Sequence, residues 1–486
     1  MEDFPKKLHH KLSKRRVQKT LRHLPGAGNL VDFSSNDYLG LSGSREIFER
    51  ASEILLENNL VKNGASGSRL LSGNHPLYSE LEEKLAEFHR TESALVFNSG
   101  YDANVGFFGS VPQRGDLVFY DEHIHASIRD GIKIGNAKSY KFKHNDLEDL
   151  KKRCCIAQGK GLAGRSAKAR TNDMTDNEAV EGPVPSTSTP LGTGAVEVYV
   201  VTESVFSMDG DSPDLKALAE FCQENNYRLV VDEAHALGVF GKNGEGLVQT
   251  LGLQDSLFAR IVTFGKSMGC HGAAILGSVF LKRYLVNFAR SLIFTTGLPP
   301  HSVATILASY QNLTKPTTYE RDESELPASP PMPKSSTKEE SIRTGQDSVS
   351  GLTASDKNQF DLSAAPSVAA LSEKIEFFKR QLAIAIPNLR TTSNSGKLEA
   401  NCAPSPSVRR KPFFIPSTSA IHSCIIPGSE KVKAVAQKLK DGGFDVRPIL
   451  SPTVPQGQER LRICLHAFNT DEEIIELIRL LVIFTR

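Results

Sequence analysis

Short apolar runs that alternate with helical stretches constrain the fold of this chain more than any other feature of its sequence. Stretches with helical periodicity, such as Leu215 to Asn225, lie between several of these runs. Right-handed βαβ crossovers accommodate such an alternation. It therefore predicts an α/β fold, in which a mainly parallel central sheet has helices on both faces. The apolar runs are Ala94 to Phe97, Leu117 to Tyr120, Val196 to Val201, Leu229 to Val231, Arg260 to Phe264 and Ala273 to Phe280.

The two ends of the chain are organised differently from this middle part. Residues 4–22 predict a charged helix, and residues from about Phe413 onward predict a smaller C-terminal α+β domain. Segments 157–194, 313–357 and 392–410 are rich in Ser, Thr, Pro and charged residues, so we expect disordered insertions there. The expected units are an N-terminal segment over residues 1–60, a large domain over 61–312 and a small domain over 358–486.

Charge and cysteine content exclude several classes of protein. The formal net charge of +2 over 486 residues is too small to indicate a nucleic-acid partner. The seven cysteines are scattered, which favours neither a disulfide framework nor a zinc site, so no metal is expected. No run approaches the roughly 18 apolar residues that a membrane span needs. We expect a cytoplasmic protein that does not bind membranes, and an organellar location stays open.

Ligands of parallel sheets bind beyond the carboxyl ends of the strands, so the residues that follow each apolar run are the candidates for a site. Ser and Gly after the first run can open a helix whose N–H groups suit a phosphate, although a plain strand-to-helix turn reads the same. The candidates at these positions are Ser99, Gly100, His125, Glu203, Ser207, Asp232, His235 and Lys266.

Lys266 is the most informative of these residues. A buried lysine loses its proton more easily than one in water, and only the neutral amine attacks a carbonyl group. By itself, Lys266 is also compatible with a surface lysine at a strand end. Asp232, at the end of another buried strand, favours a functional role for Lys266. Burying a carboxylate at that position costs free energy unless the carboxylate meets a cation. The protonated ring nitrogen of a pyridine is such a cation.

This combination resembles the pyridoxal-phosphate (PLP) enzymes of aminotransferase fold type I. The resemblance implies that Lys266 binds the cofactor covalently, that Asp232 contacts its ring nitrogen and that His125 faces its ring. It also implies a homodimer with the active site at the subunit interface. Residues that the resemblance places at the phosphate, the phenolic oxygen or the rim of the cofactor site are Ser99, Gly100, Tyr101, Glu203, Ser207, His235, Thr263 and, from the partner subunit, Thr296.

Within that fold type the chain is similar to the α-oxoamine synthases, which join an amino acid to an acyl-CoA with loss of carbon dioxide. The similarity rests on Phe33 to Leu41, Ser207 to Asp211, Ser451 to Gly457 and Glu459 to Arg462. It is strongest to the members that condense L-alanine with pimeloyl-CoA, or with the carrier-protein thioester, in biotin biosynthesis. Members that use glycine with acetyl-CoA, glycine with succinyl-CoA or serine with a fatty acyl-CoA stay open. The implied substrate-binding residues are Arg22, Thr453 and, for the amino-acid carboxylate, Arg462.

A different class, the nucleotide hydrolases, also shares two short stretches with this chain. Asp232 to His235 reads Asp-Glu-Ala-His, as in a helicase box, and Gly265-Lys266-Ser267 matches the end of a P-loop. A complete P-loop needs a glycine five residues before Gly265, where the chain has Arg260, and it precedes the acidic box rather than following it. A pseudo-enzyme is disfavoured because Lys266 and Asp232 are both present.

Overall fold

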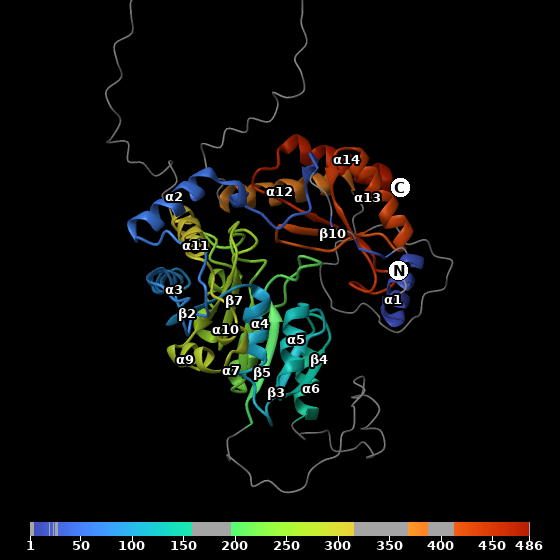
Figure 1. Ribbon diagram of the computed structural model, residues 1–486. Coiled ribbons are helices and arrows are strands. Elements are labelled where there is room, and N and C mark those ends of the chain that lie inside the picture. The colour runs from blue at the N-terminus through green and yellow to red at the C-terminus, as the bar shows by residue number, and fades with distance from the viewer. Residues whose placement is uncertain are drawn as a thin grey trace, which may run out of the picture.

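The fold is described from a computed structural model (Figure 1). The structure describes residues 4–18, 20–22, 24, 28–157, 196–314, 368–386 and 413–485. All of the third predicted insertion, and all but the first positions of the other two, lie outside these residues. Ala157 ends helix α6 (Leu147–Ala157) and Leu313 ends helix α11 (Pro300–Leu313), so these two positions are helical rather than disordered.

A seven-stranded sheet forms the centre of the larger part of the molecule and confirms the predicted mainly parallel sheet. Its strand order is β2-β8-β7-β6-β5-β3-β4, and β8 alone runs antiparallel to its neighbours. The sequence did not reveal β4, an edge strand that carries two exposed lysines, Lys138 and Lys141, and charged side chains of this kind protect edges from further pairing. The strands are β2 (Ser93–Phe97), β3 (Leu117–Asp121), β4 (Lys138–Phe142), β5 (Val198–Glu203), β6 (Arg228–Asp232), β7 (Ala259–Thr263) and β8 (Ala273–Gly277).

Helices cover both faces of this sheet because successive strand residues point to opposite sides. Val118 and Val230 pack with helices on one face, whereas Phe119 and Val231 pack with helices on the other. The first face carries α4 (Gly100–Phe108), α5 (Ala126–Ile134), α9 (Val279–Phe288) and α10 (Arg290–Ile293). The second carries α6, α7 (Leu215–Glu224) and α8 (Leu247–Thr250).

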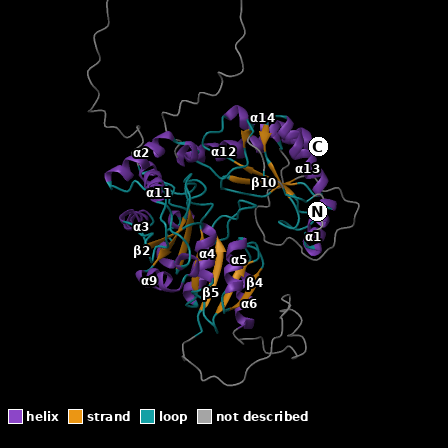
Figure 2. Ribbon diagram, viewed as in Figure 1, coloured by secondary structure: helices purple, strands orange, loops and turns teal. Residues whose placement is uncertain are grey.

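A four-stranded antiparallel sheet forms the second part and lies above the first in Figure 2. Its order is β12-β13-β10-β9, with strands β9 (Phe413–Phe414), β10 (Ile421–Ile425), β12 (Arg447–Ile449) and β13 (Arg460–Cys464). Helices α12 (Val368–Ala385), α13 (Ser429–Asp441) and α14 (Asp471–Thr485) accompany it. A hydrophobic cluster continues from the β2-β8-β7 end of the large sheet through α3 (Pro76–Phe88) and α11 into this second part.

The N-terminal segment contacts both parts. Strand β1 (Val31–Asp32) pairs in parallel with β11 (Phe444–Asp445) of the C-terminal part, whereas helix α2 (Arg45–Glu57) packs against α11. The predicted charged helix is shorter than residues 4–22: α1 spans Lys6–Val17 and buries no side chain. The described helices include none long and apolar enough to cross a membrane.

Candidate active site

The carboxyl ends of three adjacent parallel strands bring the central candidate residues to one edge of the large sheet. Glu203 ends β5, Asp232 ends β6 and Thr263 ends β7. Glu203 and Asp232 are paired in the register of their strands, so the two carboxyl groups lie on the same side of the sheet. Lys266 follows β7 by three residues. The charges of Asp232 and Glu203 act directly on its amine.

A tight turn after β7 positions Lys266. The backbone closes between Phe264 and Cys270, and Ser267 Oγ donates to the carbonyl of Leu237 at 2.6 Å. Gly269 has a φ of +61°, and a Cβ at this position would lie 2.3 Å from the backbone nitrogen of Ser42. Only glycine fits such a close approach, so the turn that carries the lysine is locked against the N-terminal segment.

Burial lowers the pKa of Lys266 to about 8, although the charges of Asp232 and Glu203 oppose this shift. A lysine in water titrates near 10.4. The amine is therefore neutral in a large fraction of molecules at slightly alkaline pH. A neutral amine can attack a carbonyl group or accept a proton, and this is the chemistry that the sequence predicted for this position.

The carboxylate of Asp232 is fixed by two hydrogen bonds. Its Oδ2 accepts from Asn104 Nδ2 at 2.9 Å, and its Oδ1 accepts from the backbone N–H of Ala234 at 2.9 Å. Asn104 lies on α4 and also donates to Ser127 Oγ at 3.0 Å. The sequence analysis missed Asn104, because a polar residue in the middle of a helix carries no signal until the facing strand is known.

Glu203 and Asp232 have different surroundings. Burial, followed by the charge of Asp232, raises the pKa of Glu203 to about 8. Glu203 Oε1 accepts from the backbone N–H of His125 at 2.5 Å. The carboxyl group of Glu203 thus carries a proton in most molecules at neutral pH, and it anchors the segment that holds His125.

His125 is the N-cap of α5. Its Nδ1 accepts from the backbone N–H of Ser127 at 3.3 Å and lies 2.7 Å from Ser127 Oγ. Burial lowers the pKa of His125, so the ring is neutral at physiological pH. Because Nδ1 accepts a hydrogen bond, the ring proton sits on Nε2, which is free to act as a donor.

The start of α4 forms a cradle beside the end of β7. Ser99 caps the helix by accepting from the backbone N–H of Asp102 at 3.1 Å. A Cβ on Gly100 would lie 2.6 Å from Thr263 Oγ1, so the glycine allows the helix start to approach the strand. The first N–H groups of a helix have no partner within it and suit a phosphate. The side chain of Tyr101 points elsewhere and donates to Asp130 at 2.7 Å.

A buried network links the two sheets at this edge. Tyr38 OH lies 2.8 Å from His235 Nδ1, and burial lowers the pKa of His235 well below its usual value. Arg462, on β13, donates through Nε to the carbonyl of Ser207 at 2.6 Å and through a terminal nitrogen to Asn36 Oδ1 at 2.8 Å. Asn36 and Tyr38 were not predicted as site residues, although they lie in the stretch Phe33 to Leu41.

Three predicted residues lie apart from this group. Arg22, Thr296 and Thr453 are exposed, and the described chain gives none of them a hydrogen bond to the residues around Lys266. The carbonyl of Thr296 accepts from Asn98 Nδ2 at 2.6 Å, and the backbone N–H of Thr453 donates to the carbonyl of Leu450. Their predicted roles stay predictions.

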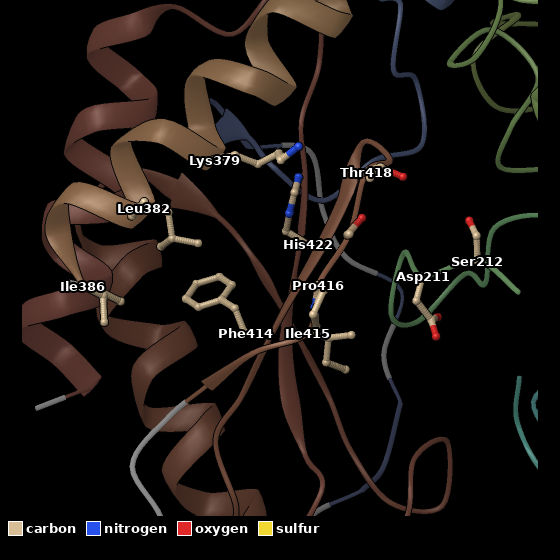
Figure 3. Close-up of a pocket in the computed structure, with 12 residues that line it drawn as sticks. Asp211, Ser212, Lys379, Leu382, Ile386, Phe414, Ile415, Pro416, Thr418 and His422 are labelled. Carbon is tan, nitrogen blue, oxygen red and sulfur yellow. The ribbon is translucent and has the colours of Figure 1, made fainter. Parts of the chain in front are cut away.

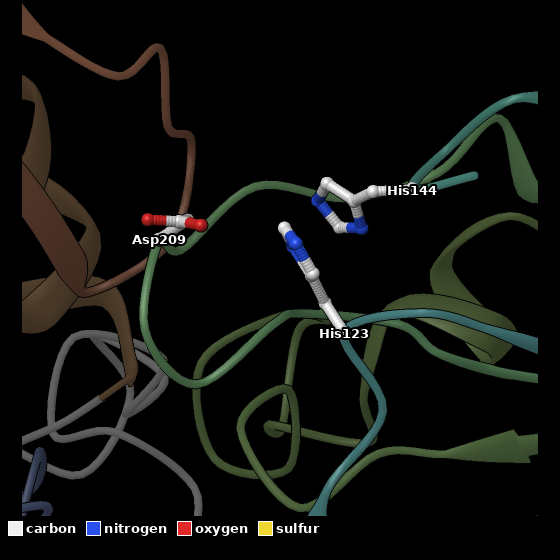
Figure 4. Close-up of side chains that lie close together, drawn as sticks. All are labelled: His123, His144 and Asp209. Atoms are coloured by element: carbon white, nitrogen blue, oxygen red, sulfur yellow. The ribbon is translucent and has the colours of Figure 1, made fainter. Parts of the chain in front are cut away.

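Two histidines, His123 and His144, lie beside the segment that carries Ser207 and Asp209. His123 and His144 stack with ring centroids 4.1 Å apart, and Asp209 is close to both (Figure 4). Both ring nitrogens of His144 lie 2.9 Å from carboxylates, Asp121 and Asp211. Burial acts against the charged ring, but these two hydrogen bonds outweigh it and raise the pKa of His144 to about 10. His144 is therefore a partly buried cation that bridges the carboxylates of Asp121 and Asp211.

Comparison with known proteins gives matches over nearly the whole chain. The sequence model of the family described as aminotransferase class I and II matches residues 28–323. The 8-amino-7-oxononanoate synthase of Emericella nidulans is 35% identical over 98% of this chain and 95% of its own length.

Solved structures agree on the fold. The serine palmitoyltransferase of S. paucimobilis, solved with PLP and myriocin bound, aligns with a TM-score of 0.69 at 22% identity over 99% of this chain and 96% of that one. The 8-amino-7-oxononanoate synthase of Francisella tularensis aligns with a TM-score of 0.59 at 23% identity, over 93% and 97% of the two chains. The predicted fold type is confirmed.

Proposed function

The chain belongs to the aminotransferase class I and II family of PLP-dependent enzymes, and we propose that it condenses L-alanine with pimeloyl-CoA, or its carrier-protein thioester, to give 8-amino-7-oxononanoate. The family confirms the predicted cofactor and the prediction of an enzyme, and it leaves no place for the nucleotide hydrolase alternative. The observation that carries the choice of substrates is the match to the E. nidulans synthase over 98% of this chain.

The residues at the sheet edge fit PLP. Gly100 lets the start of α4 lie directly against Thr263, where a Cβ would clash with Thr263 Oγ1, and we assign the cofactor phosphate to the N–H groups of this helix start, with Ser99 and the N–H of Tyr101. The remaining assignments place Asp232 at the ring nitrogen, His125 over the ring, Ser207 and His235 near the phenolic oxygen, and Lys266 at the aldehyde. PLP, when bound, supplies a ring that accepts electrons from the α-carbon of an amino acid.

The side chains of this chain supply binding and proton transfer. With its pKa lowered to about 8 by burial, the amine of Lys266 is suited to remove the α-proton of the amino acid. The Nε2–H of His125 is suited to donate to the thioester oxygen as negative charge develops there. Arg462 presents a guanidinium group to the amino-acid carboxylate from the second sheet.

The substrates can be tested by turnover. The PLP-loaded protein is incubated with L-alanine, glycine or L-serine, each with pimeloyl-CoA, acetyl-CoA, succinyl-CoA or palmitoyl-CoA, and free CoA is measured. We expect fast release with alanine and pimeloyl-CoA only. Release with glycine or serine instead would refute this substrate pair and would favour another α-oxoamine synthase activity, whereas the cofactor assignment would stand.

We further propose a homodimer whose interface completes the site. The exposure of Thr296 and Arg22 supports this, because both side chains are available to a second copy of the chain. Equilibrium sedimentation tests it: a monomer that turns over at full rate would contradict it. A cytoplasmic location stays a prediction.

A further inference from the structure

A cavity of about 670 Å³ lies in the C-terminal part, between α12 and the β9–β10 end of the four-stranded sheet (Figure 3). Its volume is in the range of small-molecule sites. No residue assigned above to PLP or to the substrates lines it, so it is separate from the proposed active site. Its apolar lining consists of Leu382, Ala383, Ile386, Phe414, Ile415 and Pro416.

The cavity has a cationic end. Lys379 reaches it from α12, and Figure 3 shows the nitrogen atoms of Lys379 and His422 turned toward each other. Lys379 also pairs with Glu376 at 2.7 Å, but both side chains are more than one third exposed. A surface pair of this kind holds its members weakly, so the ammonium group keeps donors for another anion.

His422 adds an unused donor or acceptor at the same end. Its side chain is 3% exposed, and its Nε2 has no hydrogen-bond partner among the described residues. Burial, together with the charge of Lys379, lowers the pKa of His422 to about 3, so the ring is neutral. Buried polar atoms are almost always hydrogen-bonded, so this nitrogen has an unused hydrogen-bonding capacity at the end of the cavity where Lys379 lies.

The one carboxylate of the lining does not cancel this positive end. Asp211 Oδ2 is held by His144 Nε2 at 2.9 Å and by Asn145 Nδ2 at 2.8 Å, whereas Asp211 Oδ1 has no hydrogen-bond partner among the described residues. His144 is positively charged, as described above, so the charge of Asp211 is balanced outside the cavity. Hydroxyl groups of Ser212 and Thr418 complete the polar lining.

We propose that this cavity binds a medium-chain aliphatic carboxylate. The carboxylate accepts hydrogen bonds from Lys379 and from His422 Nε2, and the hydrocarbon chain lies against Leu382, Ile386 and Phe414. The ammonium group of Lys379 at one end and the apolar wall match the charged head and the hydrocarbon chain of such a ligand.

Isothermal titration calorimetry of octanoate into the full-length, PLP-loaded protein tests the proposal, with octan-1-ol as the uncharged probe. We expect saturable binding of octanoate and at least tenfold weaker binding of octan-1-ol. Failure of octanoate to bind at millimolar concentration, or equal binding of the two probes, would overturn the proposal.

Two variants locate the binding. Lys379→Met removes the ammonium group but keeps the length of the side chain, and we expect affinity to fall about tenfold or more, since a hydrogen-bonded charge pair is lost. Ala383→Phe fills the cavity from an exposed position on α12, and we expect it to abolish binding. The matched control is Arg380→Met, one residue along the helix and outside the lining, which leaves affinity unchanged. Octanoate binding that survives both cavity variants occurs elsewhere, and the inference is then wrong.

Discussion

The two sheets contribute to the candidate active site in different ways. In the large sheet, strand pairing sets Glu203 of β5 opposite Asp232 of β6, and Asp232 opposite Ile261 of β7, two residues before Thr263 and on the same side of the sheet, so the mutual positions of the three residues follow from strand pairing. The small sheet contributes Arg462, which reaches the site across the boundary between the sheets and is held there by the carbonyl of Ser207 and by Asn36.

This difference suggests that the large sheet determines the rate of the chemical step and that the small sheet determines the choice of substrate. Groups fixed by a single parallel sheet keep their geometry through the hydrogen bonds of that sheet, which suits the bond-making chemistry common to a whole family. A group that depends on contacts between two sheets can change with those contacts, which suits the choice of substrate. Substitutions on the large sheet should therefore affect the rate of the chemical step, and substitutions on the small sheet should affect the affinity for the amino acid.

The largest expected effect is that of Lys266→Ala. We expect kcat to fall by about 10⁴-fold, because the variant loses the amine that carries the cofactor and the proposed general base. Lys216→Ala, at an exposed position on α7, is the control and should turn over normally. Near-normal product formation by Lys266→Ala would remove the lysine from the mechanism. Steady-state turnover, with circular dichroism to verify folding, provides the measurement.

Asp232→Asn should have the next largest effect. The amide keeps an oxygen that can accept from Asn104, so the fold should persist, but the negative charge opposite the cofactor ring is lost. We expect kcat to fall about 10²- to 10³-fold, with a small change in KM. Asp255→Asn, at an exposed carboxylate, serves as the control. A rise in KM alone would place Asp232 in substrate binding and would contradict the division between the sheets.

Arg462→Lys tests the small sheet. Lysine keeps the charge but loses the planar fork that binds a carboxylate with two hydrogen bonds. We expect KM for the amino acid to rise about 10- to 100-fold with a smaller change in kcat. Arg479→Lys, in a surface ion pair with Glu476, is the matched control. If kcat falls and KM stays constant, Arg462 belongs with the catalytic groups of the large sheet.

Much of the large sheet could be predicted from the sequence, because its buried strands are short apolar runs and its ligand edge follows from their direction. Lys266, Asp232 and Glu203 were identified in this way, and the structure brings them together. Strand β4 was missed because its exposed lysines hide the apolar pattern. The antiparallel direction of β8 was also missed, although the short connection between β7 and β8 leaves no room for a helical crossover.

Contacts between distant segments could not be predicted from the sequence. The pairing of Asn104 with Asp232 spans 128 positions, and that of Tyr38 with His235 spans 197. Neither pair has a local signal, because each depends on how a helix or a turn packs on the finished sheet. The cavity beside α12 is of the same kind: the cation of Lys379 and the neutral ring of His422 meet at one end of it only after α12 has packed on β10.

The smallest effect that we predict is a shift in a pH profile, and it tests how closely the carboxyl groups of the large sheet act on Lys266. Apoprotein takes up PLP through the neutral amine, so the uptake rate, followed by absorbance, should rise with pH through about 8 rather than through 10.4. Because the pKa of Glu203 is itself raised to about 8, its carboxyl ionises over the same pH range as Lys266, and the negative charge that it then carries raises the pKa of Lys266. Glu203→Gln removes that charge while keeping an acceptor for the N–H of His125. The profile of this variant should therefore move to lower pH, by less than about one unit. An unchanged profile, or one that moves to higher pH, would show that the charge of Glu203 does not act on Lys266. Strand register alone would then not bring the two groups close enough to interact electrostatically.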